Sequence, residues 1–585
     1  MIARRRNPRH LASPCGLDPA PEAMIRLEGN TKQALETARN RIVFSGIVFA
    51  LAFSVISWRL GELSLSRSGN EPTIAREAAP RQLATSRAEI LDRNGVVLAT
   101  TLPTASLYAN PRHVPRAEET AARLAAVLPG SSLQQLKRKL TSDLSYIRLE
   151  PNLTPREQYA VNRLGIPGLQ FQREERRYYP QGALTSHVVG FTSLDNQGLT
   201  GMEKSFDDLL RGSAEPLMLS LDLRLQHILT EELLKSMRHF QAIGAAGLIL
   251  DVESGEVLAM SSLPDFDPRS PGTASEVSRF NRATLGTYEM GSVFKIFTTA
   301  MALDRGVVNL SDSYDATDPI RVSGFTIRDY KPKKRRLSIP EIFIYSSNIG
   351  TVQMAMEAGT AMQQDFLGEL GLLERASLEI GEVGAPQLPA PWREINTMTI
   401  SYGHGLAVSP LQLASAVSAM VNGGEYHTPT LLKRDPSDRP QGRQVIGERT
   451  SRSMRDLMRL VVTEGTGGKA NAPGYLVGGK TGTADKLSGR GYRRGSRIAS
   501  FVAAFPMSEP RYVIFAMIDE PKGQDSSHGY ATGGWVAAPV VRAVVERMAP
   551  MVGIEPVNSE SADERGNRLL VRTSTRLEGH RVAAN

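Results

Sequence analysis

The chain has 585 residues, which at ~150 residues per domain is too long for a single small fold. It carries 69 Lys and Arg against 61 Asp and Glu, and this formal charge of +8 is too small for its length to suggest nucleic-acid binding. The single cysteine, Cys15, excludes an intramolecular disulfide, a multi-cysteine zinc site and a cysteine-ligated iron–sulfur cluster. Hydrophobic residues make up 41% of the sequence, which is enough for ordinary globular cores.

An apolar run over residues 42–58 predicts a membrane-spanning helix. Its 17 residues extend over roughly 26 Å as a helix, and the flanking arginines can reach outward to lengthen the span. Eight Lys and Arg residues precede the run against four acids. The positive-inside rule therefore predicts a cytoplasmic tail over 1–41, a transmembrane helix over 42–60 and export of the remainder. A cleaved signal peptide is disfavoured because the run starts late and no small-residue cleavage site follows it.

Residues 61–225 are predicted to form a domain that supports the rest of the chain or binds a partner. A polar stretch over 64–86 indicates a linker, and RAEILDRNGVVLAT at 87–100 predicts a β-hairpin with its turn at Asn94-Gly95. Helical patterns follow near 117–141 and 155–164. The segment shows no catalytic constellation, so we interpret it as a structural pedestal.

Residues 226–548 are predicted to form a domain with helices packed on one antiparallel sheet. Five strands are expected, at 245–252, 256–262, 478–485, 498–505 and 512–519. Helical periodicity extends over 223–240, 292–304, 339–357, 361–371, 410–421 and 450–464. Strands at both ends with helices between them indicate an α+β fold, a five-stranded antiparallel sheet covered by helices. The polar composition after residue 548 predicts a flexible tail over 549–585.

The first candidate catalytic motif is Ser292-Val293-Phe294-Lys295. The tetrapeptide alone is weak evidence in a chain with 14 lysines, but Gly291 precedes it and an apolar helical run follows. Positions i and i+3 share one helix face, so the Lys295 amine can reach the Ser292 hydroxyl. An unprotonated amine can remove the proton of a serine and make it a nucleophile.

Ser346-Ser347-Asn348 is a second candidate motif. Ser346 would pass a proton to a leaving amine, and Asn348 would hydrogen-bond a substrate amide. Ser-x-Asn is a short pattern, and both residue types are also common helix caps, so a purely structural role stays open.

Lys480-Thr481-Gly482-Thr483 is the third motif and falls on a predicted strand. Glycine within a strand is typical of a place where another backbone approaches closely, so a substrate peptide could lie along it. Lys480 and the threonine hydroxyls could hold a carboxylate, and the backbone N–H groups of Thr483 and Ser292 could form an oxyanion hole. An ordinary strand with a bulge is the alternative.

These three motifs in this order are typical of penicillin-binding proteins and serine β-lactamases. From the apolar helix to about residue 548 the chain resembles the class B penicillin-binding proteins, and among them the division-specific peptidoglycan D,D-transpeptidases. The resemblance is carried by RAEILDRNGVVLA, YYPQGALTSHVVGFT, GLTGME, SLDLRLQ, FNRATLGTYEMGSVFK, YSSNIG, SYGHGLAVSPLQLA, GGKTGTADK, IASFVAAFP and GGWVAAPVV. Ala88 stands where this family commonly has Gly, and Met290 stands where it commonly has Pro; neither residue touches the expected chemistry.

The resemblance implies a role for each matched residue. Ser292 would be the acyl-enzyme nucleophile, Lys295 its base, Ser346 the proton shuttle and Asn348 a substrate-positioning residue. The terminal carboxylate and the oxyanion would be bound by Lys480, Thr481, Gly482 and Thr483 together with the Ser292 N–H. The expected substrate is the D-Ala-D-Ala end of a peptidoglycan stem peptide, and β-lactam antibiotics would acylate the same serine. The resemblance implies no metal and no cofactor.

The resemblance further implies a cellular location and a set of partners for the protein. The protein would be a single-pass protein of the bacterial inner membrane at the division site, with a cytoplasmic N-terminus and a periplasmic catalytic domain on a pedestal or dimerisation-type domain over 61–225. A division-complex glycosyltransferase and other divisome proteins are the expected partners, and no nucleic acid is expected.

Several alternatives stay open. An elongation-specific class B transpeptidase is the closest, and a β-lactam sensor or non-catalytic penicillin-binding scaffold is the next. A β-lactamase would need neither the membrane helix nor the intervening domain, and residues 61–225 leave little room for a glycosyltransferase domain. The spacing of 54 positions from Ser292 to Ser346 and the FNRAT…YEMGSVFK wording favour the division type.

Overall fold

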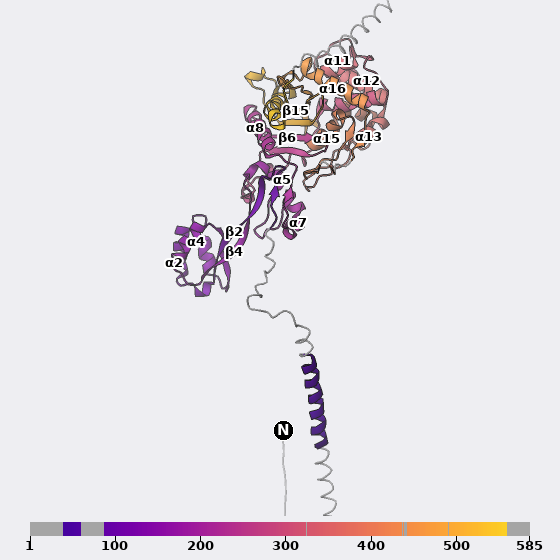
Figure 1. Cartoon of the computed structure of the whole chain (residues 1–585). Helices are drawn as coiled ribbons and strands as arrows, with labels where there is room; N and C mark the ends of the chain where they lie inside the picture. Colours follow the sequence, from indigo (N-terminus) through magenta and orange to yellow (C-terminus); the bar gives the residue numbers. More distant parts are fainter. Residues whose placement is uncertain are drawn as a thin grey trace, which may run out of the picture. The chain divides into compact units, whose positions relative to one another are not determined.

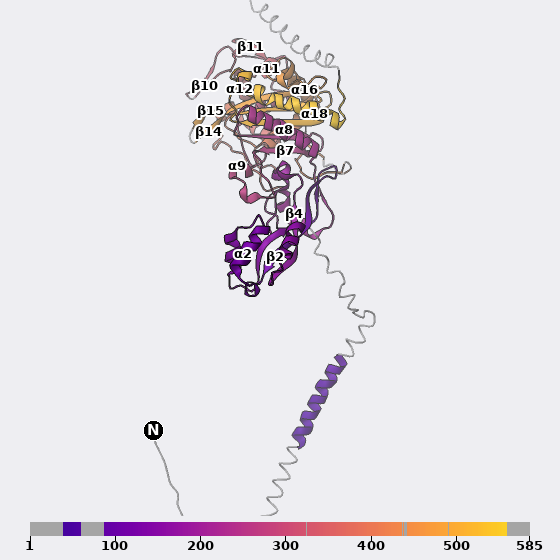
Figure 2. The same cartoon turned by 90° about the vertical axis from the view of Figure 1, so that its left-hand side faces the viewer.

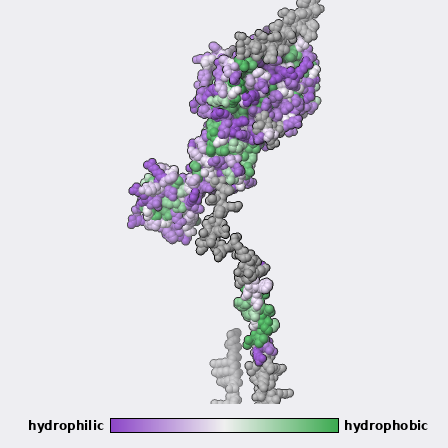
Figure 3. All heavy atoms as spheres, in the orientation of Figure 1, coloured by the Kyte–Doolittle hydropathy of each residue, from purple (hydrophilic) through white to green (hydrophobic). Residues whose placement is uncertain are grey.

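The computed structural model describes residues 39–59, 87–322, 324–435, 437, 441–488 and 491–557. The chain divides into two units, 1–84 and 85–585, which are considered separately. In the described part of the first unit, Arg39–Arg59 is a helix of 21 residues that is long and apolar enough to cross a membrane. Hydrophobic side chains form its surface, shown in green in Figure 3. The helix covers the predicted span up to residue 59 and begins three residues before it, at Arg39. Residue 60 and residues 1–38 of the predicted tail lie outside the described residues.

The second unit begins with a mixed α and β domain built around one long strand (Figure 1). In its described residues the strands are β1 (Ile90–Leu91), β2 (Val97–Ala109), β3 (Ile147–Leu153), β4 (Leu169–Tyr178) and β5 (Leu217–Met218). The helices are α2 (Ala117–Val127), α3 (Leu133–Leu140), α4 (Pro155–Asn162), α5 (Ser186–Val189), α6 (Gly201–Ser205) and α7 (Asp207–Gly212). Strand β2 pairs antiparallel with β1, β3 and β4, and β1 pairs parallel with β5. The pairing of β1 with β2 confirms the hairpin predicted at Asn94-Gly95.

A buried ion network fastens the start of this domain to its later elements. The Arg87 guanidinium donates to Glu203 and to Asp207, each at 2.6 Å, and Arg177 on β4 donates to the second oxygen of Glu203 at 2.6 Å. Glu203 lies on α6 and Asp207 begins α7, so two guanidinium groups and two carboxylates join four parts of the chain. Buried charges are tolerated when they are paired and hydrogen-bonded in this way.

A five-stranded sheet forms the centre of the larger domain within the described residues. Its order is β14 (Gly478–Ser488), β15 (Gly491–Phe505), β16 (Tyr512–Asp519), β6 (Gly244–Asp251) and β7 (Val257–Leu263). Every neighbouring pair is antiparallel. The five predicted strands and the α+β fold class are therefore confirmed.

Both faces of this sheet are covered by helices. Helices α8 (Leu223–His239) and α18 (Ala538–Met548) pack on one face, and α10 (Lys295–Asp304), α15 (Pro410–Val421) and α16 (Glu448–Thr463) on the other (Figures 1 and 2). Along β16, Ile514 and Ala516 join the core beneath α8, whereas Val513 and Phe515 join the opposite core. Burial on both faces explains why the central strands β6 and β16 are nearly continuous apolar runs in the sequence instead of alternating patterns.

Further helices and strands complete the larger domain within the described residues. They are α9 (Glu276–Arg279), α11 (Ile339–Tyr345), α12 (Asn348–Ala358), α13 (Thr360–Glu369), α14 (Glu394–Ile400), α17 (Gly533–Val536), β8 (Ser313–Asp315), β9 (Ile320–Val322), β10 (Phe325–Ile327), β11 (Arg336–Ser338), β12 (Glu425–Tyr426) and β13 (Arg443–Gln444). The single helix predicted over 339–357 is wrong, because α11 ends at Tyr345 and α12 begins at Asn348. Ser346 between them has a left-handed backbone with φ 58° and ψ 44°, which ends the first helix.

The two predicted domains share side-chain contacts. Residues of β1 and β2, including Ile90 and Leu98, belong to the same hydrophobic cluster as Phe297 of α10. The predicted boundary between residues 225 and 226 falls inside α8, and the beginning of the predicted C-terminal tail is packed, since Ala549 is buried and Ile554 contacts the core. Residues 558–585 lie outside the described residues, and the domain boundaries remain predictions.

The buried network generates the first prediction. Glu203→Ala leaves the Arg87 and Arg177 guanidinium groups buried without their shared carboxylate, so we expect the free energy of unfolding to fall by about 3–5 kcal/mol. Thermal or urea unfolding of the detergent-solubilised chain measures the change. Glu119→Ala is the control, because the Arg116–Glu119 pair is 82% and 54% exposed and is worth less than about 1 kcal/mol. Equal losses in the two variants would contradict the prediction.

Candidate active site

The proposed nucleophile, Ser292, lies on a 3₁₀ turn, η4 (Gly291–Phe294), that leads directly into α10. Gly291 has φ +54°, and a Cβ at this position would lie 2.5 Å from the carbonyl oxygen of Thr483. Only glycine therefore allows the turn to adopt this conformation and to touch strand β14. The close approach places the Ser292 hydroxyl beside the strand that carries the third motif.

The Lys295 amine is the centre of the site. Its side chain is 1% exposed, and Nζ lies 3.1 Å from Ser292 Oγ, 3.0 Å from Ser346 Oγ and 2.6 Å from the Ser346 carbonyl oxygen. Asn348 Oδ1 is a further acceptor at 2.7 Å. The structure thus brings the first and second motifs into direct contact, although more than 50 residues separate them.

Ser346 Oγ connects the two buried amines. It lies 3.0 Å from Lys295 Nζ and accepts a hydrogen bond from Lys480 Nζ at 3.0 Å. The residue occupies a left-handed backbone region that costs a non-glycine residue of order 1–3 kcal/mol, and such conformations concentrate at functional sites. This conformation holds the hydroxyl between the two lysines.

Lys480 lies on β14, which is the edge strand of the five-stranded sheet. Its side chain is 0% exposed, with Nζ 5.9 Å from the centre of the Phe343 ring. Two residues further, a Cβ on Gly482 would lie 2.6 Å from the carbonyl oxygen of Met290 and 2.3 Å from Ser500 Oγ. The glycine is therefore required for backbone contact between β14 and the turn that carries Ser292.

Burial shifts the pKa values of both amines in the same direction. It lowers the pKa of Lys480 to about 7. It also lowers the pKa of Lys295 well below its ordinary value, with a further decrease from the positive charge of Lys480 and an opposing effect of the Asp329 carboxylate. Loss of hydration disfavours the charged form of an amine, and two nearby amines disfavour each other's charge. The lowered pKa favours the uncharged form of Lys295, which is the form that can act as a base.

The hydrogen-bond partners of Lys295 Nζ are compatible with an uncharged amine. The Ser346 carbonyl oxygen and Asn348 Oδ1 can only accept hydrogen bonds, and a neutral amine has two N–H groups to give them. The lone pair that remains is available to the Ser292 hydroxyl at 3.1 Å. The arrangement suits general-base activation of a serine.

The two threonines of the third motif face different neighbours. Thr481 Oγ1 is 2.8 Å from Thr466 Oγ1, whereas Thr483 Oγ1 donates to the Gly482 carbonyl oxygen and accepts from the Gly533 N–H at 3.1 Å. Thr466 was not predicted from the sequence, because nothing in the run TEGTGG marks this threonine as a binding residue. Its position beside Thr481 adds a second hydroxyl to the place expected to hold a carboxylate.

Residues that support the second motif were also missed. Asp329 and the carbonyl oxygen of Arg328, in the loop after β10, hydrogen-bond to Ser347, Asn348 and Ile349. No local pattern in the sequence predicts this contact, because it depends on the loop folding back over the gap between α11 and α12. Within the described residues, no group of three or more His, Cys, Asp or Glu side chains could hold a metal ion.

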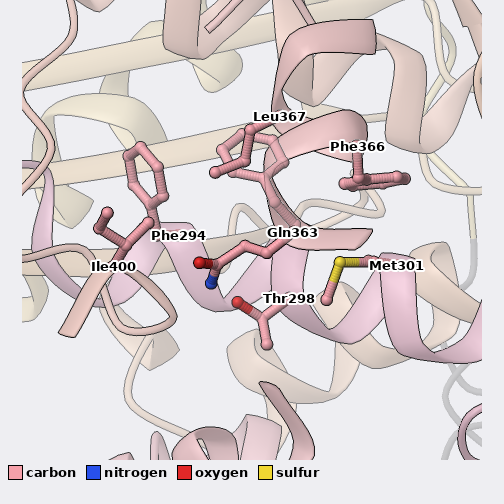
Figure 4. A pocket seen from close by; sticks show the side chains of 8 residues that line it. Phe294, Thr298, Met301, Gln363, Phe366, Leu367 and Ile400 are labelled. Carbon is pink, nitrogen blue, oxygen red and sulfur yellow. The ribbon is translucent and has the colours of Figure 1, made fainter. Parts of the chain in front are cut away.

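A small cavity lies behind the helix of the nucleophile (Figure 4). It is lined by Phe294, Phe297, Thr298, Met301, Gln363, Phe366, Leu367 and Ile400. Its volume of about 10 Å³ suits roughly one water molecule, and the buried Oε1 of Gln363 has no hydrogen-bond partner among the described residues. The rest of the surroundings of α10 is closely packed, which fixes the helix that carries Lys295.

Comparisons with known proteins agree with this geometry. Residues 245–546 match the penicillin binding protein transpeptidase domain, and residues 82–224 match the penicillin-binding protein dimerisation domain. The chain is 41% identical over 483 residues to the probable peptidoglycan D,D-transpeptidase FtsI of Caulobacter vibrioides, covering 80% of this chain and 82% of the relative. It is 32% identical over 516 residues to the peptidoglycan D,D-transpeptidase FtsI of Escherichia coli, covering 82% and 86%.

A solved structure shows the same fold. Penicillin binding protein 3 of Mycobacterium tuberculosis, crystallised with aztreonam, superposes with a TM-score of 0.64 at 23% identity, covering 81% of this chain and 98% of that chain.

The close approach at Gly482 generates the second prediction. Gly482→Ala forces β14 away from the turn of Ser292, and a displacement of about 1 Å in a reactive site can cost 10²-fold in rate. We expect the rate of covalent labelling by a fluorescent penicillin to fall by about that factor, with the thermal midpoint shifted by a few degrees at most. Gly272→Ala is the matched control, because nothing lies within 4 Å of its Cβ. Labelling of Gly482→Ala at the unchanged rate would contradict the role assigned to the glycine.

Proposed function

The chain belongs to the class B penicillin-binding proteins, and as a member of that family it is a peptidoglycan D,D-transpeptidase; we propose that it cross-links septal cell wall through an acyl-enzyme on Ser292. The observation that carries the residue assignment is the position of the Lys295 amine, which is within hydrogen-bonding distance of Ser292, Ser346 and Asn348 at once. The substrate is a stem peptide that ends in D-Ala-D-Ala, and β-lactam antibiotics are bound as well.

Acylation begins with proton transfer from Ser292 to Lys295. As the proton leaves, Oγ forms a bond to the carbonyl carbon of the penultimate D-Ala. The C–N bond to the terminal D-Ala then breaks, and the leaving nitrogen receives a proton through the Ser346 hydroxyl, which contacts both amines. General acid–base steps of this kind contribute about 10²–10⁴-fold. The products are free D-Ala and an ester on Ser292.

The second half-reaction reverses these proton movements. An amine of a second stem peptide attacks the ester carbonyl, gives up a proton to the same base, and releases Ser292 Oγ, which takes a proton back. Penicillin enters the first half-reaction only, since its opened β-lactam ring stays attached to the serine. The outcome for peptidoglycan is one new amide bond between two strands for each D-Ala released.

Substrate binding is assigned to the edge of β14. Lys480, whose pKa is lowered to about 7, and the hydroxyl of Thr481 with its neighbour Thr466 bind the terminal carboxylate. The backbone N–H groups of Ser292 and Thr483 form the oxyanion hole, supported by the contact between their strand and turn at Gly291. Asn348 retains one N–H for a substrate carbonyl, because its amide nitrogen gives the other to the Arg328 carbonyl oxygen.

The membrane helix indicates the cellular location of the enzyme. The N-terminal helix Arg39–Arg59 and the family are consistent with a single-pass protein of the inner membrane. The excess of Lys and Arg before the helix supports a cytoplasmic N-terminus and a periplasmic catalytic domain. We assign the protein to the division site, with a division-complex glycosyltransferase and other divisome proteins as partners, on the strength of its similarity to FtsI of two organisms.

Loss of the nucleophile generates the third prediction. Ser292→Ala removes the atom that bonds to the acyl group, so covalent labelling of the full-length chain by fluorescent penicillin should disappear on a denaturing gel. The thermal midpoint should stay near that of the unmodified protein. Ser453→Ala, a change at a half-buried serine of α16 whose hydroxyl donates to the Arg449 carbonyl oxygen, should label normally. Persistent labelling of Ser292→Ala would refute the assignment of the nucleophile.

The division assignment generates the fourth prediction. Depletion of the protein should block septum completion while side-wall growth continues, so the cells should become filaments in phase-contrast microscopy. A wild-type copy should restore division, and a Ser292→Ala copy should not. Round, swollen cells would favour the elongation-specific alternative, and rescue by Ser292→Ala would favour a non-catalytic scaffold.

A further inference from the structure

The loop that follows β10 lies against the break between α11 and α12. Asp329 Oδ2 accepts a hydrogen bond from the Ser347 hydroxyl at 2.8 Å, and its Oδ1 accepts from the Ile349 backbone N–H at 3.0 Å. The carbonyl oxygen of the preceding Arg328 accepts from Asn348 Nδ2 at 2.9 Å. Two consecutive loop residues thus contact three consecutive residues at the start of α12.

The contact with the Arg328 carbonyl determines how the Asn348 amide is oriented. A carbonyl oxygen can only accept, so the amide nitrogen must face it. The amide oxygen is then directed to Lys295 Nζ, which lies 2.7 Å from it. An inverted amide would place an N–H donor against an amine that needs an acceptor there. The loop therefore controls one of the two acceptors that hold the amine of the base.

The carboxylate of Asp329 stabilises the beginning of α12 at the same time. Ser347 is the N-cap of this helix, since its hydroxyl accepts from the Gly350 N–H at 3.1 Å while it donates to Asp329. The Ile349 N–H would have no partner within the helix, and the negative charge lies at the end of the helix dipole that favours it. Ser347 and its neighbours are consequently fixed from outside the helix.

We propose that Asp329, acting with the Arg328 carbonyl, is a positioning residue for the acylation step, one that holds Ser346, Asn348 and through them the Lys295 amine in the reactive arrangement. The inference rests on the proposed function of Ser292 and Lys295. Asp329 itself touches neither substrate nor nucleophile and acts only through the second motif.

The charge of Asp329 predicts a change in the pH dependence of acylation, which a purely structural role would not produce. Three charged or titratable groups face Lys295: Lys480 from β14, Asp329 from the loop and His404 from the turn after α14. Lys480 lowers the pKa of Lys295, whereas the Asp329 carboxylate raises it. Removal of this negative charge therefore lets Lys295 stay neutral to a lower pH. The acidic limb of the acylation profile should move to lower pH when Asp329 loses its charge.

The test compares Asp329→Asn and Asp329→Ala in the full-length, detergent-solubilised protein. The second-order rate constant of penicillin acylation is measured from pH 4 to pH 9, and the folded fraction is determined by active-site titration. Asp329→Asn keeps an acceptor for the Ile349 N–H but loses the one for Ser347, and Asp329→Ala loses both. We expect acylation at the optimum to fall in the order wild type, Asn, Ala, with the alanine variant slower by about tenfold to a hundredfold. In Asp329→Asn the acidic midpoint should also lie below that of the wild type.

Asp315→Asn is the matched control. It makes the same chemical change on β8, where the exposed carboxylate interacts with Thr317 and Arg336 and with none of the three motifs, so its acylation profile should equal that of the wild type. Unchanged acylation in both Asp329 variants would overturn the proposal, as would a loss explained entirely by the folded fraction with no shift of the acidic limb. If either outcome occurs while labelling still depends on Ser292, only the positioning role of Asp329 is refuted. If Ser292→Ala is itself labelled, the proposed function of Ser292 is refuted instead.

Discussion

The Lys295 amine lies where a turn, a helix break and a sheet edge meet, and the rest of the domain is constrained by the need to keep it there without a charge. In the described part of the chain, neither Lys295 nor Lys480 hydrogen-bonds a carboxylate. Burial without a counter-ion is costly for an ammonium group, so the protein lowers the pKa of the amine instead of pairing it. The same desolvation that would destabilise a charged lysine therefore produces the base that the chemistry requires.

Such an arrangement depends on rigid surroundings, because a neutral amine has only two N–H groups and one lone pair to distribute. The left-handed Ser346, the close contact at Gly291 and the two acceptors of Lys295 each restrict a different segment. Helix α10 is fixed in turn by buried packing against the sheet and α13, with a small cavity beside Gln363 (Figure 4). These three features together restrict the position of one amine.

Local patterns in the sequence are sufficient to predict the strands and helices of the scaffold, but they do not predict the detailed geometry of the site. Four of the five strands were predictable because their apolar runs are short and bounded by glycine and proline turns, whereas β14, GGKTGTADKLS, has no such run and was predicted from its place between them. Helix α16 was predictable because its apolar periodicity is strong, and α15 because it is a longer apolar run. The break at Ser346 was not, since the apolar pattern continues through it and the left-handed residue there is a serine. Asp329 and Thr466 were missed for a related reason: their partners lie 18 and 15 residues away, and only the folded chain brings them together.

The edge position of β14 joins the scaffold to the proposed chemistry. An exposed sheet edge offers unpaired backbone groups and is a liability for aggregation, so proteins keep such edges short, covered or charged. Here the turn of Ser292 approaches the strand at Gly482, and the N-terminus of α17 contacts it at Thr483. Between these contacts the Thr481 and Thr483 side chains are half-buried, whereas Lys480 is fully buried. The proposed pairing of an extended peptide with β14 is therefore confined to a short stretch of the edge beside the turn of Ser292.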